Sequence, residues 1–251
     1  MLEIHQFPHP PLDNYGVLIH DTDTGETAAV DAGDGTSYLA ALKETGWTLT
    51  QIWVTHHHHD HVTGLAQVKS ATGAKVYGPT GIDGVDHALS GGDSFTFAGR
   101  QVDVIHTPGH TSDMLNFHIA SERVVFTGDT LFVMGCGRLF EESPETMWDS
   151  LQKLAELPED TKVYCSHEYT LANAKFALSV DPDNIALRNR AIEVEQLRDQ
   201  GDPTVPSTIG AELETNPFLR CADPLIRKAL VLEHASDAEV FAELRKRKDN
   251  F

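Results

Sequence analysis

The sequence predicts an α/β protein whose layered core of strands and helices is followed by a small all-helical C-terminal domain. Three observations support this class. Short apolar strands alternate with helices in the first part of the chain, more strands cluster between residues 94 and 126, and helical segments alone fill the chain after residue 170. We therefore expect a mixed sheet or two stacked sheets, and a domain boundary near residue 170.

The first third of the chain predicts strands that alternate with helices. Strands are expected at residues 2–7, 15–20 and 27–31, where turns containing Pro and Gly separate them. A helix over residues 37–44 should end at Gly46, and a strand follows at 51–54. A second helix over 62–72 should end at Gly73 before a strand at 75–77. This order favours an α/β core.

The rest of the chain predicts strands first and helices later. A hairpin is expected from strands 94–98 and 101–106, then strands at 114–119 and 123–126. Ser143 followed by Pro144 starts a helix that runs to about residue 157, and 162–165 is the last expected strand. Helices are expected at 171–179, 185–200 and 237–246, the last preceded by the capping box of Ser236 and Glu239.

The composition excludes several functional classes. The 251 residues are 40% hydrophobic, and 19 basic against 38 acidic residues give a net charge of −19, which disfavours nucleic acid and anionic membranes as partners. No uncharged apolar run approaches the ~18 residues that span a bilayer, and the start of the chain does not resemble a signal peptide. The three cysteines suggest neither a disulfide framework nor a thiolate zinc site. We therefore expect a soluble cytoplasmic protein.

The stretch from Thr55 to His61 contains five histidines and Asp60 in six consecutive positions, directly after an expected strand. Zinc and similar ions bind neutral imidazoles and carboxylates, so the stretch predicts a metal-binding loop. A histidine tag would lie at a terminus and is disfavoured. His110, Asp129 and His167 each follow a further strand. A lone histidine or Gly-Asp pair is usually structural, but together with the loop these three predict additional ligands.

The pattern His56-x-His58-x-Asp60-His61, followed by His110, Asp129 and His167, resembles the metallo-β-lactamase superfamily, specifically its binuclear hydrolase branch. The resemblance implies an αββα sandwich of two mixed sheets and two divalent metal ions per chain, zinc being expected although iron or manganese accept the same ligands. It implies that His56, His58 and His110 hold one ion and that Asp60, His61 and His167 hold the other. Asp129 would bridge them, a metal-bridging hydroxide would be the nucleophile, and Asp60 and Asp129 would be the catalytic carboxylates. His57 and His59 would be outer or solvent residues.

Four further stretches resemble the glyoxalase II family, the hydroxyacylglutathione hydrolases. They begin at Cys136, Ser166, Thr215 and Leu244 and read CGRLFE, SHEYT, TNPFLR and LRKRKD. The resemblance implies a catalytic domain over residues 1–170 and a helical glutathione-binding domain over 171–251. The implied reaction is hydrolysis of S-(2-hydroxyacyl)glutathione, typified by S-D-lactoylglutathione, to glutathione and D-lactate, the second step of methylglyoxal detoxification.

The same resemblance implies a set of glutathione contacts, which in this sequence are Arg138, Phe140, Tyr169, Arg245 and Lys248. Phe140 departs from the tyrosine that is frequent in the family, so it offers no hydroxyl. Four of the 19 basic residues lie at 245–248, which suits an anionic substrate of an acidic protein. Alternatively, these cations only favour the C-terminus of a helix and stay solvated, and we interpret Lys246 and Arg247 in this way.

Other functions remain as alternatives. A mononuclear iron persulfide dioxygenase of the same superfamily would share the loop at 56–61, but should lack the long helical tail. A metal-binding protein without catalysis would turn over neither substrate, and a nuclease of this fold is disfavoured by the acidic charge. We expect a monomer whose partner is a small-molecule glutathione thioester, with neither nucleic acid nor membrane as a partner.

Overall fold

The computed structural model describes residues 1–251, which form two compact units. The first unit comprises Met1–His106 and Asp113–Gly128, and the second comprises Thr107–Ser112 and Asp129–Phe251. The first unit holds two sheets with helices, and the C-terminal region is helical, so the predicted α/β class is confirmed. The domain boundary near residue 170 stays a prediction.

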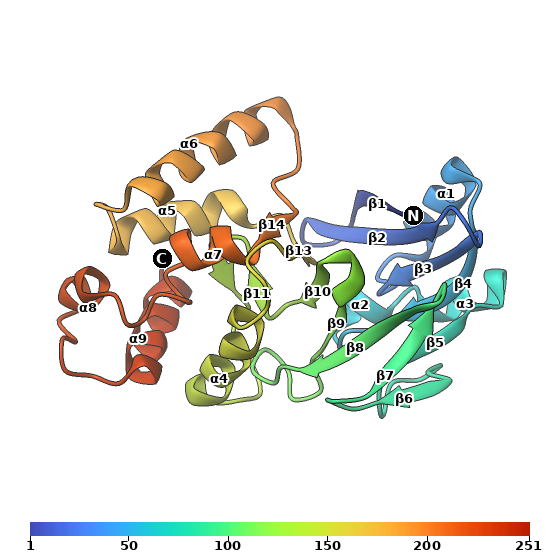
Figure 1. Ribbon diagram of the computed structural model, residues 1–251, viewed down its shortest axis with the longest axis horizontal. Helices are drawn as coiled ribbons and strands as arrows, with labels where there is room; N and C mark the ends of the chain where they lie inside the picture. Colours follow the sequence, from blue (N-terminus) through green and yellow to red (C-terminus); the bar gives the residue numbers. More distant parts are fainter. The chain divides into compact units, whose positions relative to one another are not determined.

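The larger sheet of the first unit is mixed (Figure 1). Its strands lie in the order β1-β2-β3-β4-β5-β6, where the first three are antiparallel and β3 to β6 are parallel. The carboxyl ends of β3 to β6 therefore share one edge of the sheet. The strands are β1 (Leu2–His9), β2 (Asn14–Asp21), β3 (Glu26–Val30), β4 (Thr48–Trp53), β5 (Lys75–Pro79) and β6 (His87–Leu89).

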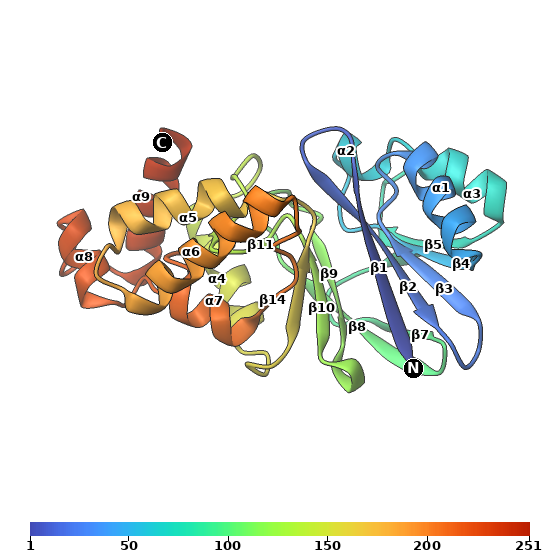
Figure 2. The ribbon, with the colours of Figure 1, turned by 90° about the horizontal axis from the view of Figure 1, so that it is seen from above.

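Helices α1 (Gly35–Thr45) and α3 (Leu65–Thr72) lie together on one face of this sheet (Figure 2). The Asp34 side chain caps α1 by accepting a hydrogen bond from the Ser37 amide at 2.9 Å. Gly46 and Gly73 end the two helices in the left-handed conformation, as the sequence predicts. The helices and strands bury a shared apolar core, which includes Leu18, Tyr38, Leu42, Ile52, Val54, Leu65, Val68 and Val76.

The second sheet of the first unit is an antiparallel array in the order β10-β9-β8-β7. Its strands are β7 (Ser94–Phe97), β8 (Arg100–His106), β9 (Leu115–Ile119) and β10 (Val124–Gly128), and a short 3-10 helix, η1 (Ala120–Glu122), connects the last two.

Trp53 at the end of β4 joins the two sheets. Its side chain is fully buried, and its indole nitrogen donates to Gln51 Oε1 at 2.9 Å. The ring lies 5.4 Å from the centroids of Phe95 and Phe97 and 5.7 Å from that of Phe117. Because these partners come from the second sheet, the indole packs between the two layers.

The second unit is mainly helical, with two pairs of short strands. The strand pairs are β11 (Leu131–Phe132) with β12 (Gly135–Cys136), and β13 (Lys162–Cys165) with β14 (Ser207–Thr208). The helices are α4 (Pro144–Ala155), α5 (Thr170–Val180), α6 (Ile185–Gln200), α7 (Ile209–Thr215), α8 (Pro224–Leu230) and α9 (Asp237–Asp249). The predicted Ser143 cap and the capping box of Ser236 and Glu239 are both present.

The hairpin of β11 and β12 is fixed by two buried side chains of α7 and its C-cap. Glu212 accepts a hydrogen bond from the Met134 amide at 2.7 Å. Asn216 donates to the carbonyls of Phe132 at 3.2 Å and Gly135 at 2.9 Å, and to Glu212 at 2.9 Å. Since these two-residue strands make few backbone hydrogen bonds of their own, the side chains of 212 and 216 define the hairpin's shape.

Several expectations from the sequence were wrong or incomplete. Residues 162–165 are not the last strand, because β14 follows, and the stretch 55–61 is not all loop, because a one-turn helix α2 (His59–Val62) begins inside it. The elements β6, β11, β12, α7 and α8 were not predicted from the sequence. These elements are short, so each offers too few residues for a periodic pattern.

No helix combines the length and the apolar character needed to cross a bilayer.

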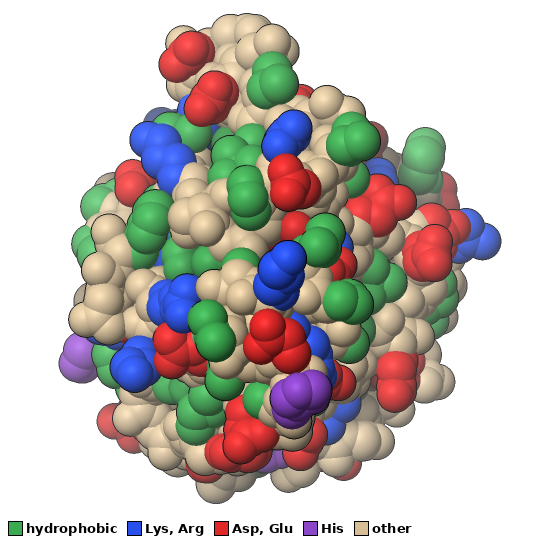
Figure 3. Space-filling view, turned by 90° about the vertical axis from the view of Figure 1, so that its left-hand side faces the viewer, with side chains coloured by type: hydrophobic (Ala, Val, Ile, Leu, Met, Phe, Trp, Pro, Cys, Tyr) green, Lys and Arg blue, Asp and Glu red, His purple; other side chains and the backbone are tan.

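One face of the molecule, seen in Figure 3, carries basic and acidic side chains intermixed with hydrophobic ones, and the basic groups on this face do not gather into one strip.

Candidate active site

The first unit brings together the four ligands predicted in the histidine loop. The chain leaves β4 at Trp53 and reaches His56 three residues later, at the sheet edge where the parallel strands end. The ligand atoms of His56 lie within 4.8 Å of those of His58 and His61. His61 Nε2 is 3.4 Å from Asp60 Oδ2. Imidazoles and a carboxylate at these separations are the donor types that divalent transition metals prefer.

His57 and His59 differ from their neighbours. The His57 side chain is 44% exposed, and its Nδ1 lies 3.0 Å from Asp113 Oδ1. His59 is exposed at the start of α2. The assignment of His57 and His59 as outer or solvent residues stays a prediction.

Asp31 is a positioning residue that the sequence analysis missed. It directly follows β3 with a positive φ of 60°, and it is buried. Its carboxylate accepts hydrogen bonds from the Thr55 amide at 2.7 Å and from His61 Nδ1 at 2.8 Å. The second bond places the proton of His61 on Nδ1 and leaves Nε2 as the ligand atom, as in many metal sites. The signal in the sequence is Asp31-Ala32-Gly33 after a buried strand, but the sequence predicts Asp31 as the last residue of the strand at 27–31.

The position of Asp60 depends on two other residues. Asn14 lies at the start of β2, in the first hairpin. Its Nδ2 donates a hydrogen bond to Asp60 Oδ2 at 3.1 Å. A Cβ at Gly33 would lie 1.8 Å from the Asp60 carbonyl oxygen, so only glycine permits this approach of the two backbones. The carboxylate of Asp60 is therefore held by Asn14, and its backbone packs closely against Gly33.

Replacing Asp31 by asparagine is expected to weaken metal binding by about 10- to 100-fold, because the carboxylate that orients His61 loses its charge. Competition of the purified protein with a coloured chelator measures this affinity. Asp34→Asn is the matched control, since it removes the same charge nearby while asparagine still caps α1. Equal metal affinities of the two variants would contradict the positioning role of Asp31.

The second unit brings together the other three predicted ligands. His110 Nε2 lies 3.3 Å from Asp129 Oδ2, and His167 Nε2 lies 3.2 Å from the same oxygen. All three side chains are buried. His167 is fixed by stacking on Tyr169, with ring centroids 4.6 Å apart. Two imidazole nitrogens thus converge on one carboxylate oxygen.

The proton arrangement at His110 fits a cation at this oxygen. His110 Nδ1 lies 2.7 Å from the Arg138 carbonyl oxygen, which can only accept, so Nδ1 carries a proton. In a neutral imidazole Nε2 then offers a lone pair, which faces an Asp129 oxygen that is also an acceptor. Two acceptors this close need a cation or a proton between them. A divalent metal ion satisfies this requirement, and the outer bond to a carbonyl is typical of metal-ligating histidines.

Groups of histidine and aspartate side chains able to hold a metal ion occur in this chain. They are drawn from the seven residues that the sequence analysis singled out, namely His56, His58, Asp60, His61, His110, Asp129 and His167.

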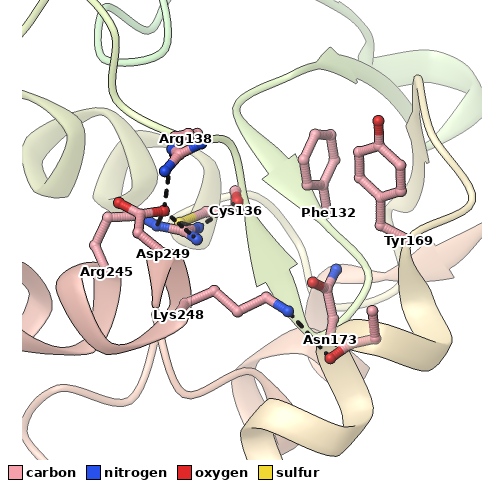
Figure 4. A pocket seen from close by; sticks show the side chains of 9 residues that line it. Phe132, Cys136, Arg138, Tyr169, Asn173, Arg245, Lys248 and Asp249 are labelled. Carbon is pink, nitrogen blue, oxygen red and sulfur yellow. Dashed lines mark hydrogen bonds and ion pairs between the residues drawn. The ribbon is translucent and has the colours of Figure 1, made fainter. Parts of the chain in front are cut away.

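Four of the five predicted glutathione contacts line one pocket of about 270 Å³ in the second unit (Figure 4). These four are Arg138, Tyr169, Arg245 and Lys248, and the remaining lining residues are Phe132, Cys136, Ala172, Asn173 and Asp249. Phe140 is not among them. Its side chain is 61% exposed, and its ring lies edge-on to His110 at 5.2 Å.

The cations of the pocket differ in how firmly they are held. Arg245 is only 6% exposed, donates to the Cys136 carbonyl at 2.9 Å and lies over the Phe218 ring at 5.1 Å. Lys248 is half-buried and donates to the Ala172 carbonyl at 3.1 Å. Burial, and then the charge of Arg245, lowers the pKa of the Lys248 amine. Arg245 is therefore a fixed cation of the pocket wall.

Cys136 contributes an uncharged side chain to the lining of the same pocket. Burial raises the pKa of its thiol to about 11, although Arg245 beside it acts in the opposite direction. The thiol is therefore protonated at neutral pH, and it is not a nucleophile in this state.

Comparison with known proteins defines the class of the chain first. Residues 10–85 and 79–167 match the family described as the metallo-beta-lactamase superfamily. Among solved structures, the B3 metallo-beta-lactamase BLEG-1 is similar, with a TM-score of 0.67 and 24% identity over 87% of this chain and 100% of that one. ETHE1 from Myxococcus xanthus has a TM-score of 0.70 and 24% identity over 97% of this chain and 90% of that one. At these identities the two structures support the fold alone.

Sequence relatives define the family more closely. Residues 168–251 match the family described as the hydroxyacylglutathione hydrolase C-terminus. The hydroxyacylglutathione hydrolase of Rhizobium johnstonii is 53% identical over 95% of both chains. That of Mesorhizobium japonicum is 52% identical over 100% of this chain and 99% of its own length. The chain belongs to the hydroxyacylglutathione hydrolase family of the metallo-beta-lactamase superfamily.

Proposed function

We propose that this protein hydrolyses S-(2-hydroxyacyl)glutathione, typified by S-D-lactoylglutathione, to glutathione and a 2-hydroxy carboxylate such as D-lactate. One observation carries the proposal beyond the family relationship. Part of the basic pocket is lined by residues that come shortly after metal-type ligands in the chain: Phe132 and Cys136 follow Asp129, and Tyr169 follows His167. A site for an anionic substrate and a metal-ligand set are thus built from the same segments. By this reaction the protein would perform the second step of methylglyoxal detoxification.

The seven His and Asp side chains would hold two divalent ions, zinc being our proposal for both. His56, His58 and His110 would hold one ion, Asp60, His61 and His167 the other, and Asp129 would bridge them. When bound, such ions lower the pKa of a coordinated water from 15.7 toward about 7 and polarise a carbonyl group. Asp31 and the Arg138 carbonyl support this role by keeping a proton on Nδ1 of His61 and of His110.

The pocket would bind the glutathione part of the thioester. Glutathione carries two carboxylates, and Arg138, Arg245 and Lys248 provide the only basic side chains of the pocket. The leaving thiolate has a parent pKa near ~8.5, so it departs without prior protonation, whereas an amide nitrogen would need a general acid. A thioester therefore needs no general acid from the protein.

The test is a thiol-release assay on the purified, metal-loaded protein. With S-D-lactoylglutathione and a thiol reagent, we expect thiol release that a chelator abolishes and added metal restores. His58→Ala should abolish the release, whereas His59→Ala, at an exposed position in the same loop, should not. A metal-loaded protein that releases no thiol would refute the proposed function.

The persulfide dioxygenase is less supported, because relatives that are 50–54% identical over nearly the whole chain carry the name hydroxyacylglutathione hydrolase. Elemental analysis and an oxygen electrode separate the two activities. Two ions per chain favour the hydrolase, whereas one iron with oxygen consumption on glutathione persulfide favours the dioxygenase. We further propose a monomer located in the cytoplasm, in which residues 1–170 form the catalytic domain and 171–251 the glutathione-binding domain.

A further inference from the structure

The basic pocket contains a carboxylate of the protein itself, that of Asp249, and Figure 4 shows it between two guanidinium groups. Asp249, the last residue of α9, accepts from Arg245 Nε at 3.1 Å and lies 2.9 Å from Arg245 Nη2. The same oxygen, Oδ1, is 3.5 Å from Arg138 Nε. Asp249 thus contacts two of the three cations proposed to receive the substrate.

We infer that Asp249 is an internal competitor that weakens the binding of the glutathione carboxylates and sets the affinity of the pocket for this part of substrate and product. The inference rests on the proposed function, which supplies the anionic ligand. A carboxylate of the ligand is chemically equivalent to that of Asp249, so both require the same guanidinium donors. The ligand must either displace Asp249 from Arg138 and Arg245 or bind to a pocket whose charge Asp249 has reduced.

Arg245 has partners besides Asp249 that hold it in place. The guanidinium is already fixed by its bond to the Cys136 carbonyl and by the Phe218 ring beneath it. Arg138, by contrast, is 57% exposed and has Asp249 as its only carboxylate partner. Lys248 contacts a carbonyl and two aromatic rings but no carboxylate. Removing the charge of Asp249 should therefore leave the pocket intact and more cationic.

A competing carboxylate has a clear consequence for turnover. The glutathione part is common to the thioester and to the released product, so tighter binding of this part stabilises both equally. Such uniform binding lowers KM without accelerating the chemical step, and it retains the product. Asp249 would favour release of glutathione at the expense of a higher KM.

The test compares Asp249→Asn with Glu243→Gln. Both variants remove one negative charge from α9, but Glu243 pairs with Lys246 and Arg247 outside the pocket. Asparagine keeps the shape of Asp249 and can still accept from Arg245. Calorimetry with glutathione on the metal-loaded proteins should give a Kd about three- to tenfold lower for Asp249→Asn than for the wild type. The KM for lactoylglutathione and the Ki of glutathione should fall by the same factor, and Glu243→Gln should change neither.

Several outcomes would overturn the inference. An unchanged or higher Kd of Asp249→Asn would show that Asp249 positions the cations instead of competing for them, and an equal gain in Glu243→Gln would show a general charge effect. A wild type that binds no glutathione would also refute it. Because binding is measured without turnover, a protein that binds glutathione in the expected order but hydrolyses no thioester would contradict the proposed function and leave the role of Asp249 standing.

Discussion

Replacing Asp129 by asparagine is expected to reduce thioester turnover by roughly 10²- to 10³-fold or more, the loss typical when one electrostatic group of a catalytic centre is removed. Nε2 of both His110 and His167 faces this carboxylate, at 3.3 and 3.2 Å. Without its charge, His110 and His167 lose the carboxylate between them, and Asp60 is the only carboxylate left among the proposed ligands of two cations. Elemental analysis of the purified variant should therefore show fewer than two ions per chain, together with the loss of thiol release.

The fold itself should survive this change, since asparagine has nearly the same shape as aspartate. Far-UV circular dichroism should match the wild type, which separates loss of the metal from loss of structure. If the variant kept both ions and most of its turnover, the bridging role of Asp129 would be wrong.

Replacing Trp53 by alanine is expected to lower the free energy of unfolding by about 3 to 5 kcal/mol, the usual cost of removing a large buried aromatic side chain. The indole is fully buried between the two sheets of the first unit and contacts Phe95, Phe97 and Phe117. Since native domains are stable by only about 5 to 15 kcal/mol, the loss is a large part of the total. Denaturant titration of the purified variant measures it.

Trp47→Ala provides the matched comparison. Trp47 is only half-buried and stacks on His20 at 4.4 Å, so its removal leaves little empty volume. It should shift the denaturation midpoint much less than Trp53→Ala. Equal shifts would mean that the aromatic contacts between the sheets contribute little.

The elements that the sequence predicted well carry strong local signals. The helix at Ile185–Gln200 and the strand at Lys162–Cys165 were predicted with the observed bounds, and the last helix was recognised from its capping box. The missed elements are defined by distant residues instead. The hairpin at 131–136 takes its shape from Glu212 and Asn216, about 80 residues away, and no local pattern reveals such partners.

The candidate site also contains some residues that local sequence patterns reveal and others that depend on distant parts of the chain. The histidine loop was evident because its density of ligand types is high, and the family resemblance then related it to His110, Asp129 and His167. Asp31 was missed because its role depends on a parallel strand pair that brings the ends of β3 and β4 together. The proposed role of Asp249 could not be predicted from the sequence either. Acidic residues near basic ones are common on helices, and the role follows only from the position of Asp249 in the pocket.

The attachment of the hairpin to α7 also bears on how this chain can change during evolution. The hairpin begins just after Asp129 and includes the pocket-lining residues Phe132 and Cys136. The side chains that bond to its backbone come from residues 212 and 216. A recombination that exchanged only the segment after residue 168 would replace those side chains and leave the hairpin's amide and carbonyl groups buried without partners. We therefore expect the tail and the hairpin to be inherited together, although they are far apart in the sequence. A relative with a different tail would need a different hairpin. The part of its pocket that the hairpin lines would then differ as well.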